Sequence, residues 1–208
     1  MIAIAQRVSR AEVRIDAEIV GRIDKGVLLL VGVERGDTEA DADVLARKLV
    51  ALRIFPSRTP MDLSLKDAGG ACLVVSQFTL AGSIRKCNRP SFDRAEDPVL
   101  AQALYQRVAE RIAADGIPVS CGRFAADMDV ELVNDGPVTF IIETRDGALA
   151  GHCLQPASRG PWVKVRCFTT EDTEVTAPDR KGRVGFVRSE PLLPFRPLCS
   201  LCSLWWKS

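Results

Sequence analysis

Two short stretches combine residues in a way that could support ester chemistry. The first, SQFT, ends an apolar run with Ser76, Gln77, Phe78 and Thr79. Polar side chains at a strand end can line a pocket, and backbone N–H groups freed there can hold a developing oxyanion. Threonine and phenylalanine also favour strands in their own right, so a structural role for this stretch stays open.

The second stretch, NDGPVT at 134–139, places Gly136-Pro137 inside a strand-like pattern. Proline cannot donate to a β ladder and belongs at turns, edges or strand starts. The structural interpretation is a tight turn at residues 134–136 between two strands. By itself this turn indicates nothing about function.

Several common catalytic devices are missing from residues 1–144. This part has no histidine, since the single one is His152. A Ser-His-Asp or Cys-His arrangement and a His-ligated metal are therefore excluded there. The GG pair at 69–70 is too short for a Walker-type phosphate loop. Chemistry must rely on backbone donors, hydroxyls, carboxylates or the substrate's own groups, and we expect neither cofactor nor metal.

The seven cysteines give no strong metal signal. Cys72, Cys87 and Cys121 are scattered, and in a chain without secretory signals such residues are expected to be buried thiols. The CSLC stretch at 199–202 has the spacing of half a zinc site, but a second pair at matching spacing is missing.

Charge is unevenly distributed along the chain. Residues 1–144 contain 18 Lys+Arg and 21 Asp+Glu, a net of −3, and residues 145–208 contain 10 and 6, a net of +4. Because residues 1–144 carry a net negative charge, we do not expect them to bind the nucleic-acid backbone over a broad surface, and any RNA contact should be local. No apolar run approaches the roughly 20 residues that span a bilayer, and no signal peptide is evident. We expect a cytoplasmic protein without membrane contact.

Apolar, β-branched runs predict strands at 2–8, 12–15, 18–23, 26–33, 71–80, 118–124, 128–133 and 137–143. The continuous run VLLLV at 27–31 is typical of a central strand covered on both faces. Helical spacing predicts one helix over 37–53, capped by Asp37. A second helix is predicted to start at Pro98 after the cap Asp97 and to stop at Gly116.

Because strands outnumber helices, the pattern predicts an α+β domain over residues 1–144. We expect a closed or strongly curved, mainly antiparallel sheet with two helices packed on one side. Residues 145–208 hold six of the 12 prolines and all three tryptophans, and they sustain no periodicity. They are expected to form an irregular C-terminal extension, either a partner-binding segment or sequence that has left its proper reading frame.

In its SQFT and NDGPVT stretches the chain resembles the D-aminoacyl-tRNA deacylase family of chiral proofreading enzymes. The family's S-Q-F-T motif matches residues 76–79, and its N-x-G-P-x-T motif matches Asn134 to Thr139. The stretches MIAIAQRV, RIF, AGG, RPSF and GRFAADM also look like the family and occur in the same order. The resemblance covers about residues 1–144, essentially a whole family member.

The resemblance implies a homodimer that cleaves the ester of D-aminoacyl-tRNA at its subunit interface. The Gly136-Pro137 peptide, in the cis form, would enter the partner's pocket and act as a chirality filter. Its main-chain carbonyls would collide with an L side chain, whereas a D side chain points elsewhere. Because glycine has no side chain to reject, glycyl-tRNA should also enter.

The resemblance also implies roles for individual residues. Backbone N–H groups of Phe78 and Thr79 would stabilise the oxyanion, and Ser76 and Gln77 would orient the adenosine or the carbonyl. The substrate's 2′-hydroxyl could help to activate water. Thr79 has been regarded as a nucleophile in this family, but a lone threonine needs a base, and we favour a positioning role.

The second motif and its surroundings also receive roles. Asn134 and Thr139 would contribute to substrate binding beside the Gly-Pro pair. Arg7 would hold the Gly-Pro loop, or is an ordinary surface arginine on a strand. The cations that would touch tRNA phosphates, or belong to a solvated loop, are Arg85, Lys86 and Arg89. In the same loop Cys87 replaces the small glycine expected of the family. The resemblance therefore does not predict the detailed contacts of this loop with the substrate.

Two other functions remain as alternatives. One is a catalytically silent tRNA-binding or interaction module that keeps the fold. The other is a general esterase, which is disfavoured because no nucleophile–base pair is present. The intact SQFT and NDGPVT motifs favour the hydrolase.

Overall fold

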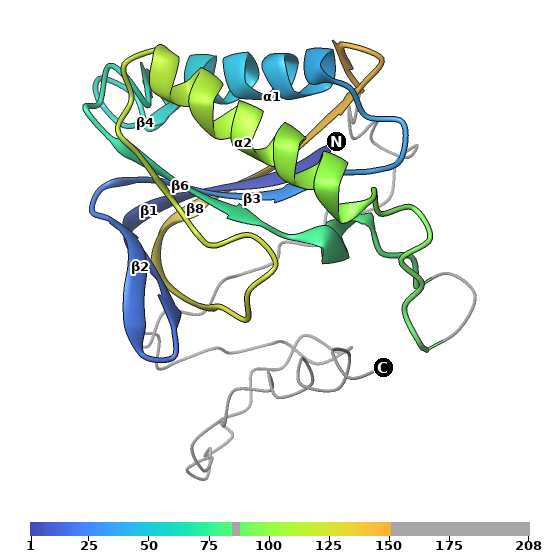
Figure 1. The fold of residues 1–208 in the computed structure, drawn as a ribbon. Coiled ribbons are helices and arrows are strands. Elements are labelled where there is room, and N and C mark those ends of the chain that lie inside the picture. The colour runs from blue at the N-terminus through green and yellow to red at the C-terminus, as the bar shows by residue number, and fades with distance from the viewer. Residues whose placement is uncertain (85–87, 151–208) are drawn as a thin grey trace, which may run out of the picture. The chain divides into compact units, whose positions relative to one another are not determined.

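The computed structural model describes residues 1–84 and 88–150. Its main feature is a seven-stranded sheet in the order β7-β6-β3-β1-β8-β9, with β2 paired to β1. Helices α1 and α2 lie together on one side of this curled sheet (Figure 1). The strands of the sheet are β1 (Ile2–Ile15), β2 (Glu18–Ile23), β3 (Gly26–Gly32), β6 (Ala71–Ser76), β7 (Val119–Cys121), β8 (Asp129–Arg145) and β9 (Ala148–Leu149).

The predicted α+β class and strongly curved sheet are confirmed. The pairs β3–β6 and β6–β7 are parallel, and the other pairs of the sheet are antiparallel. Two short strands, β4 (Arg53–Phe55) and β5 (Leu63–Ser64), pair separately. Among the described residues the sheet is open rather than closed, since its order ends at β7 and β9.

Strand β1 is one long strand where two were predicted. Its first half pairs with β3 and its second half with β2, so a single strand belongs to both parts of the sheet. Within the break predicted over residues 9–11, the structure has only an irregularity in the β1–β8 ladder, between Val8 and Arg10. A bulge of this kind bends a strand and increases its twist without ending it.

Strand β8 is likewise continuous where two strands were predicted. Gln6 pairs with Thr139 and Val8 pairs with Asn134, so residues 135–138 stand opposite Arg7 alone. The predicted turn is therefore an enlarged bulge within one strand. Pro137 has no backbone N–H, and it is tolerated there because the bulged segment lies outside the paired ladder.

Strand β3 is central and buried on both faces, as its continuous apolar run predicts. Leu29 and Val31 belong to the larger hydrophobic core, which also contains buried residues of both helices. Leu28 belongs to a smaller core on the opposite face, together with Leu73 and Val75 of β6. The helices therefore cover one face of the sheet and leave the other face partly open.

The two helices are α1 (Glu39–Ala51) and α2 (Pro98–Ala114). The start of α2 is confirmed, since the Asp97 side chain accepts a hydrogen bond from Val99 N and Pro98 is the first helical residue. Gly116 follows the helix with φ +84°, as the predicted stop requires.

The predicted cap of α1 is wrong by one residue. Thr38 is the N-cap and forms a capping box with Asp41. The side chain of Asp37 instead accepts a hydrogen bond from the Met1 ammonium group at 2.6 Å and one from Glu34 N. Asp37 is thus held by the chain terminus rather than by the helix.

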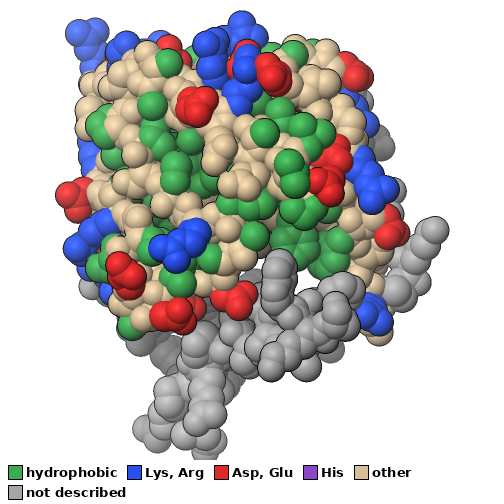
Figure 2. Space-filling model, viewed as in Figure 1, with side chains coloured by type: hydrophobic (Ala, Val, Ile, Leu, Met, Phe, Trp, Pro, Cys, Tyr) green, Lys and Arg blue, Asp and Glu red, His purple; other side chains and the backbone are tan. Residues whose placement is uncertain are grey.

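The outer face of the helices carries a mixture of charges. Arg107 of α2 pairs with Glu39 and Asp43 of α1, and Arg111 also pairs with Asp43. In Figure 2 basic and acidic side chains lie side by side at the top of the view, above a region of mostly apolar and uncharged side chains. The outer face of the helices is therefore not a uniformly basic surface for nucleic acid. No helix in the described part of the chain is long and apolar enough to cross a membrane.

Candidate active site

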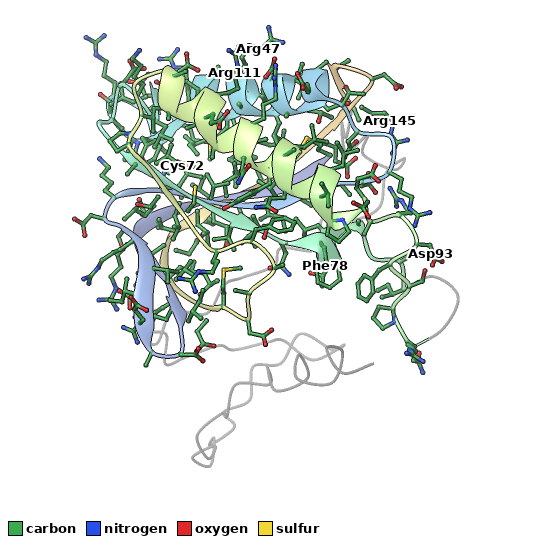
Figure 3. All side chains as sticks on the ribbon, in the orientation of Figure 1. Arg47, Cys72, Phe78, Asp93, Arg111 and Arg145 are labelled. Atoms are coloured by element: carbon green, nitrogen blue, oxygen red, sulfur yellow. The ribbon has the colours of Figure 1, made fainter. Side chains whose placement is uncertain are left out.

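The SQFT motif lies where β6 gives way to a helical turn. Ser76 ends β6, and the turn η1 (Phe78–Ala81) follows, so the predicted strand over 71–80 is four residues too long. As the chain leaves β6, the Gln77 N–H donates to Val31 O of β3 at 2.7 Å. Figure 3 shows Phe78 at this edge of the sheet.

A glycine of β3 makes room for the turn. A Cβ atom on Gly32 would lie 2.8 Å from Leu80 Cβ and 3.0 Å from Gln77 O. Both contacts are closer than ordinary packing permits, so η1 can sit over the end of β3 only because residue 32 has no side chain. The position of the SQFT backbone therefore depends on Gly32.

The exposure of the motif suits contact with a ligand. Ser76 and Gln77 are half-buried, whereas Phe78 and Thr79 are exposed. The first residues of a helical turn have no intrahelical partner for their N–H groups, which leaves those of Phe78 and Thr79 to bind elsewhere.

The hydroxyl of Thr79 is bound to a neutral group. Gln77 Nε2 donates a hydrogen bond to Thr79 Oγ at 2.6 Å. An amide side chain is not a base, so this contact orients the hydroxyl without activating it as a nucleophile. The geometry agrees with a positioning role for Thr79.

The second motif is held by a buried arginine. Arg7 is 7% exposed. Its Nε donates to Asp135 O at 3.1 Å and lies 2.9 Å from Asp135 Oδ2, and its terminal nitrogen donates to Ile54 O of β4. Arg7 is therefore not an ordinary surface arginine, and it contacts the residue before Gly136-Pro137.

The Gly-Pro pair itself is presented outward. The Gly136-Pro137 peptide is cis, as the resemblance implies. Gly136, Pro137, Asn134 and Thr139 are all exposed. The Asn134 Oδ1 atom accepts a hydrogen bond from Gln6 Nε2 at 3.4 Å.

The two motifs do not meet within one chain. Ser76 pairs with Val31, which pairs with Ala3, whereas the Gly-Pro bulge stands opposite Arg7, four residues further along β1. Three strand steps also separate β6 from β8. With about 3.3 Å per residue and about 4.8 Å between strands, the motifs lie roughly 13 Å apart along β1 and roughly 14 Å apart across the sheet.

The loop after η1 adds one residue to which sequence reasoning gave no role. Phe92 lies beside Phe78, with ring centroids 5.0 Å apart and an angle of 62° between the rings. Phe92 belongs to the RPSF stretch, which contributed to the family resemblance but did not indicate a role for this residue. Arg89 is exposed in this loop. The other predicted tRNA contacts, Arg85 and Lys86, and also Cys87, lie outside the described residues.

The two cysteines in the described part of the chain differ in their exposure. Cys72 is buried beneath the helices, as predicted (Figure 3). Burial raises the pKa of its thiol far above the ordinary value, which keeps it neutral. Cys121 is exposed, so the prediction of a buried thiol is wrong for that residue. Within residues 1–84 and 88–150, no cluster of His, Cys, Asp and Glu could hold a metal ion, and the CSLC stretch lies outside them.

Comparisons with known proteins show to which family the chain belongs. Residues 4–143 match the family model described as D-Tyr-tRNA(Tyr) deacylase. The chain is 53% identical over 146 residues to a D-aminoacyl-tRNA deacylase of Persephonella marina, which covers 70% of this chain and 99% of that protein.

Two solved structures are also similar. One is named c-Myc DNA Unwinding Element Binding Protein, at 34% identity and a TM-score of 0.66, covering 70% of this chain and 99% of that one. A probable eukaryotic D-amino acid tRNA deacylase, at 17% identity and a TM-score of 0.60, covers 67% and 97% and shows the shared fold alone. On its sequence match and its fold, this chain belongs to the D-Tyr-tRNA(Tyr) deacylase family.

Proposed function

We propose that this chain hydrolyses the ester that joins a D-amino acid to the terminal adenosine of tRNA. The products are free D-amino acid and tRNA, so the reaction is a chiral proofreading step that takes place in the cytoplasm. The observation that carries the proposal is that SQFT ends β6 and leads into a turn at which Phe78 and Thr79 are exposed, in a chain that belongs to this deacylase family. We assign the activity to residues 1–144.

The chemistry needs little from side chains. Water attacks the ester carbonyl carbon, and the resulting oxyanion is held by the N–H groups of Phe78 and Thr79. The bond to the ribose oxygen then breaks, and that oxygen takes up a proton. The substrate's 2′-hydroxyl helps to activate the water, while Ser76 and Gln77 orient the adenosine or the carbonyl.

The site is completed by a second copy of the chain. Since the two motifs lie far apart in one chain, the Gly136-Pro137 bulge has to act on the SQFT turn of a partner. A cross-strand apolar row on the face opposite the helices supports a homodimer; it runs through Val75, Leu30, Ile4 and Ile141. Ile141 is 62% exposed in the single chain, and a partner would cover it.

The second motif selects the stereoisomer. The backbone of Gly136-Pro137, flanked by Asn134 and Thr139, forms a wall that an L side chain would strike and a D side chain would avoid. Glycyl-tRNA passes this filter because it has no side chain. Arg89, with Arg85 and Lys86, contacts tRNA phosphates near the acceptor end.

Mixing two impaired variants tests the cross-subunit site. Gln77→Pro disrupts the turn, and Arg7→Gln releases the bulge, so each homodimer should lose most of its activity on D-tyrosyl-tRNA, on the order of 100-fold for Arg7→Gln. Co-refolded mixed dimers contain one intact site and should recover activity. No recovery in verified mixed dimers would place both motifs in one subunit. A wild-type chain that binds D-tyrosyl-tRNA but releases no D-tyrosine would favour the silent binding module.

A further inference from the structure

The carboxylate of Glu34 is buried two residues beyond the end of β3, and the chemistry proposed above does not use it. Glu34 is 4% exposed, and glutamate is almost never fully buried unless it is paired. Its partners are two arginines: Arg94, in the loop between η1 and α2, and Arg145, the last residue of β8, at 3.5 Å. In Figure 3 Asp93 marks this loop and Arg145 marks the end of β8.

The backbone of the neighbouring residues holds the same loop. Arg35 N donates a hydrogen bond to Arg94 O at 2.9 Å, and Glu96 N donates one to Val33 O at 3.2 Å. This segment of the loop therefore runs antiparallel to the chain that leaves β3. The buried carboxylate adds an ion pair to these two backbone bonds.

The loop carries Phe92, which contacts the SQFT turn. Two hydrogen bonds fasten its other end, Ser83 N to Ser91 O at 2.7 Å and Ser91 N to Ser83 O at 2.9 Å. Phe92 follows directly, and its ring meets the Phe78 ring edge to face, with centroids 5.0 Å apart. Phe78 supplies one of the N–H groups that hold the oxyanion in the proposed reaction. A shift of the loop at Glu34 would therefore reach this donor through one ring contact.

We propose that Glu34 is a positioning residue for the deacylation, which keeps the Phe78 N–H aligned by fixing Arg94 and with it the loop that carries Phe92. This inference rests on the proposed function. An oxyanion donor acts mainly in the transition state, so its displacement lowers kcat and leaves KM nearly unchanged. A loss of stability alone would leave kcat per folded molecule as it is. Arg145 ties the same carboxylate to β8 rather than to the loop, so it should have no part in the rate.

Steady-state deacylation of D-tyrosyl-tRNA by the full-length chain separates the two arginines. Glu34→Gln keeps the size of the side chain but removes its charge, and kcat per folded molecule should fall on the order of 10- to 100-fold with KM unchanged. Arg94→Gln should do the same. The double variant should lose no more than either single variant, because both changes remove one interaction. Arg145→Gln breaks the other ion pair of the carboxylate and, as the matched control, should keep kcat.

Amide hydrogen exchange tests the same contact without turnover. Glu34→Gln and Arg94→Gln should exchange faster than the wild-type chain over residues 91–97 and over η1, whereas Arg145→Gln should not. If Glu34→Gln does not fold, Arg94→Gln decides alone, since the Arg94 side chain is 56% exposed.

Three results would overturn the inference. Arg94→Gln could keep the wild-type kcat, or Arg145→Gln could lower kcat equally, which would make Glu34 a structural residue only. The losses of the two single variants could also multiply in the double variant. The proposed function fails separately, when the wild-type chain releases no D-tyrosine. In that case unchanged exchange over η1 in Arg94→Gln would still refute the role of Glu34.

Discussion

The buried guanidinium of Arg7 binds Asp135 at the point where β8 leaves its ladder with β1. The Arg7 Nε atom lies 3.1 Å from the Asp135 carbonyl oxygen and 2.9 Å from its carboxylate oxygen Oδ2. Asp135 is the residue before Gly136, so this one side chain fixes the start of the Gly-Pro bulge. Its further bond to Ile54 O ties the bulge to β4 as well.

Arg7→Gln should therefore release the bulge. A shift of about 1 Å in a positioning group can cost on the order of 100-fold in rate, so kcat/KM on D-tyrosyl-tRNA should fall by that order. Two carbonyl oxygens, of Ile54 and Asp135, lose their donor, at about 1–3 kcal/mol each when buried, and the Asp135 carboxylate loses its ion pair, so the free energy of unfolding should fall too. Steady-state deacylation and urea unfolding measure the two effects.

Arg10→Gln is the matched control for the loss of an arginine from β1. Arg10 pairs with Glu131 while both side chains are more than half exposed, and such pairs contribute about 0–1 kcal/mol. This variant should keep its activity and stability. Equal losses in both variants would show that Arg7 has no special relation to the bulge.

Gly32→Ala should displace the SQFT turn. The new methyl group would meet Leu80 Cβ at 2.8 Å, and the turn must move to relieve the contact. Overpacking of this kind costs about 1–3 kcal/mol of stability, and kcat should fall on the order of 100-fold. Gly21→Ala creates a similar contact, 2.8 Å from Cys121 O, away from the site. It should lose stability but keep kcat, and a kcat loss in both variants would refute a role for the turn.

Thr79→Ala should retain most of the activity. The hydroxyl is bound by the neutral Gln77 amide at 2.6 Å, and the proposed oxyanion contact is the backbone N–H, which alanine keeps. We expect kcat within about ten-fold of wild type, since only a positioning contact is lost. Near-total loss in Thr79→Ala, with activity restored by Thr79→Ser and an intact fold in both, would show that the hydroxyl acts as the nucleophile.

A chain cut after Ala150 should fold and stay active, since the matching relatives correspond to this part. A chain cut after Thr144 should be less stable. It loses β9 and the hydrogen bond from Gly147 N to the buried Asp41 carboxylate at 2.9 Å, a loss of about 1–3 kcal/mol. Thermal unfolding at fixed concentration compares the two. An unfolded 1–150 chain would show that residues 151–208 belong to the core.

Asp41 should make stability depend on acid pH. Burial favours the neutral carboxyl, but hydrogen bonds from Gly147 N and from Thr38 together hold the pKa of Asp41 below its ordinary value. Its contribution is therefore present above the unfolded pKa of about 3.9 and is lost as the pH falls through the folded pKa. Urea unfolding between about pH 6 and pH 3 should show a shallower decline for Asp41→Asn. Asp24→Asn, at an exposed position, controls for net charge, and an equal decline in both would contradict the assignment.

Local signals were enough to predict some elements from sequence. Helix α2 follows from Asp97, Pro98 and Gly116, which act within the helix itself. The cap of α1 was misassigned because Asp37 has a partner 36 residues away, the Met1 ammonium group. No local pattern reports a contact of that range.

The residues of the proposed site could be named from the sequence, but their geometry could not. The motifs pointed to SQFT and NDGPVT, and they suggested Arg7 as a support. Their separation depends on the register of β1 with both β3 and β8, which is a property of the assembled sheet. The same holds for Phe92, whose meaning comes from Phe78 beside it. Strand continuity through the bulges also depends on the partner strand rather than on the residues themselves.

The most direct test of the central claim is deacylation of matched D- and L-tyrosyl-tRNA by the purified full-length chain. We predict rapid release of D-tyrosine, release from glycyl-tRNA as well, and no release from the L ester above the enzyme-free rate. Equal hydrolysis of both stereoisomers would contradict the filter at Gly136-Pro137. If neither the full chain nor the 1–150 chain releases D-tyrosine from D-tyrosyl-tRNA, the enzymatic assignment itself is contradicted.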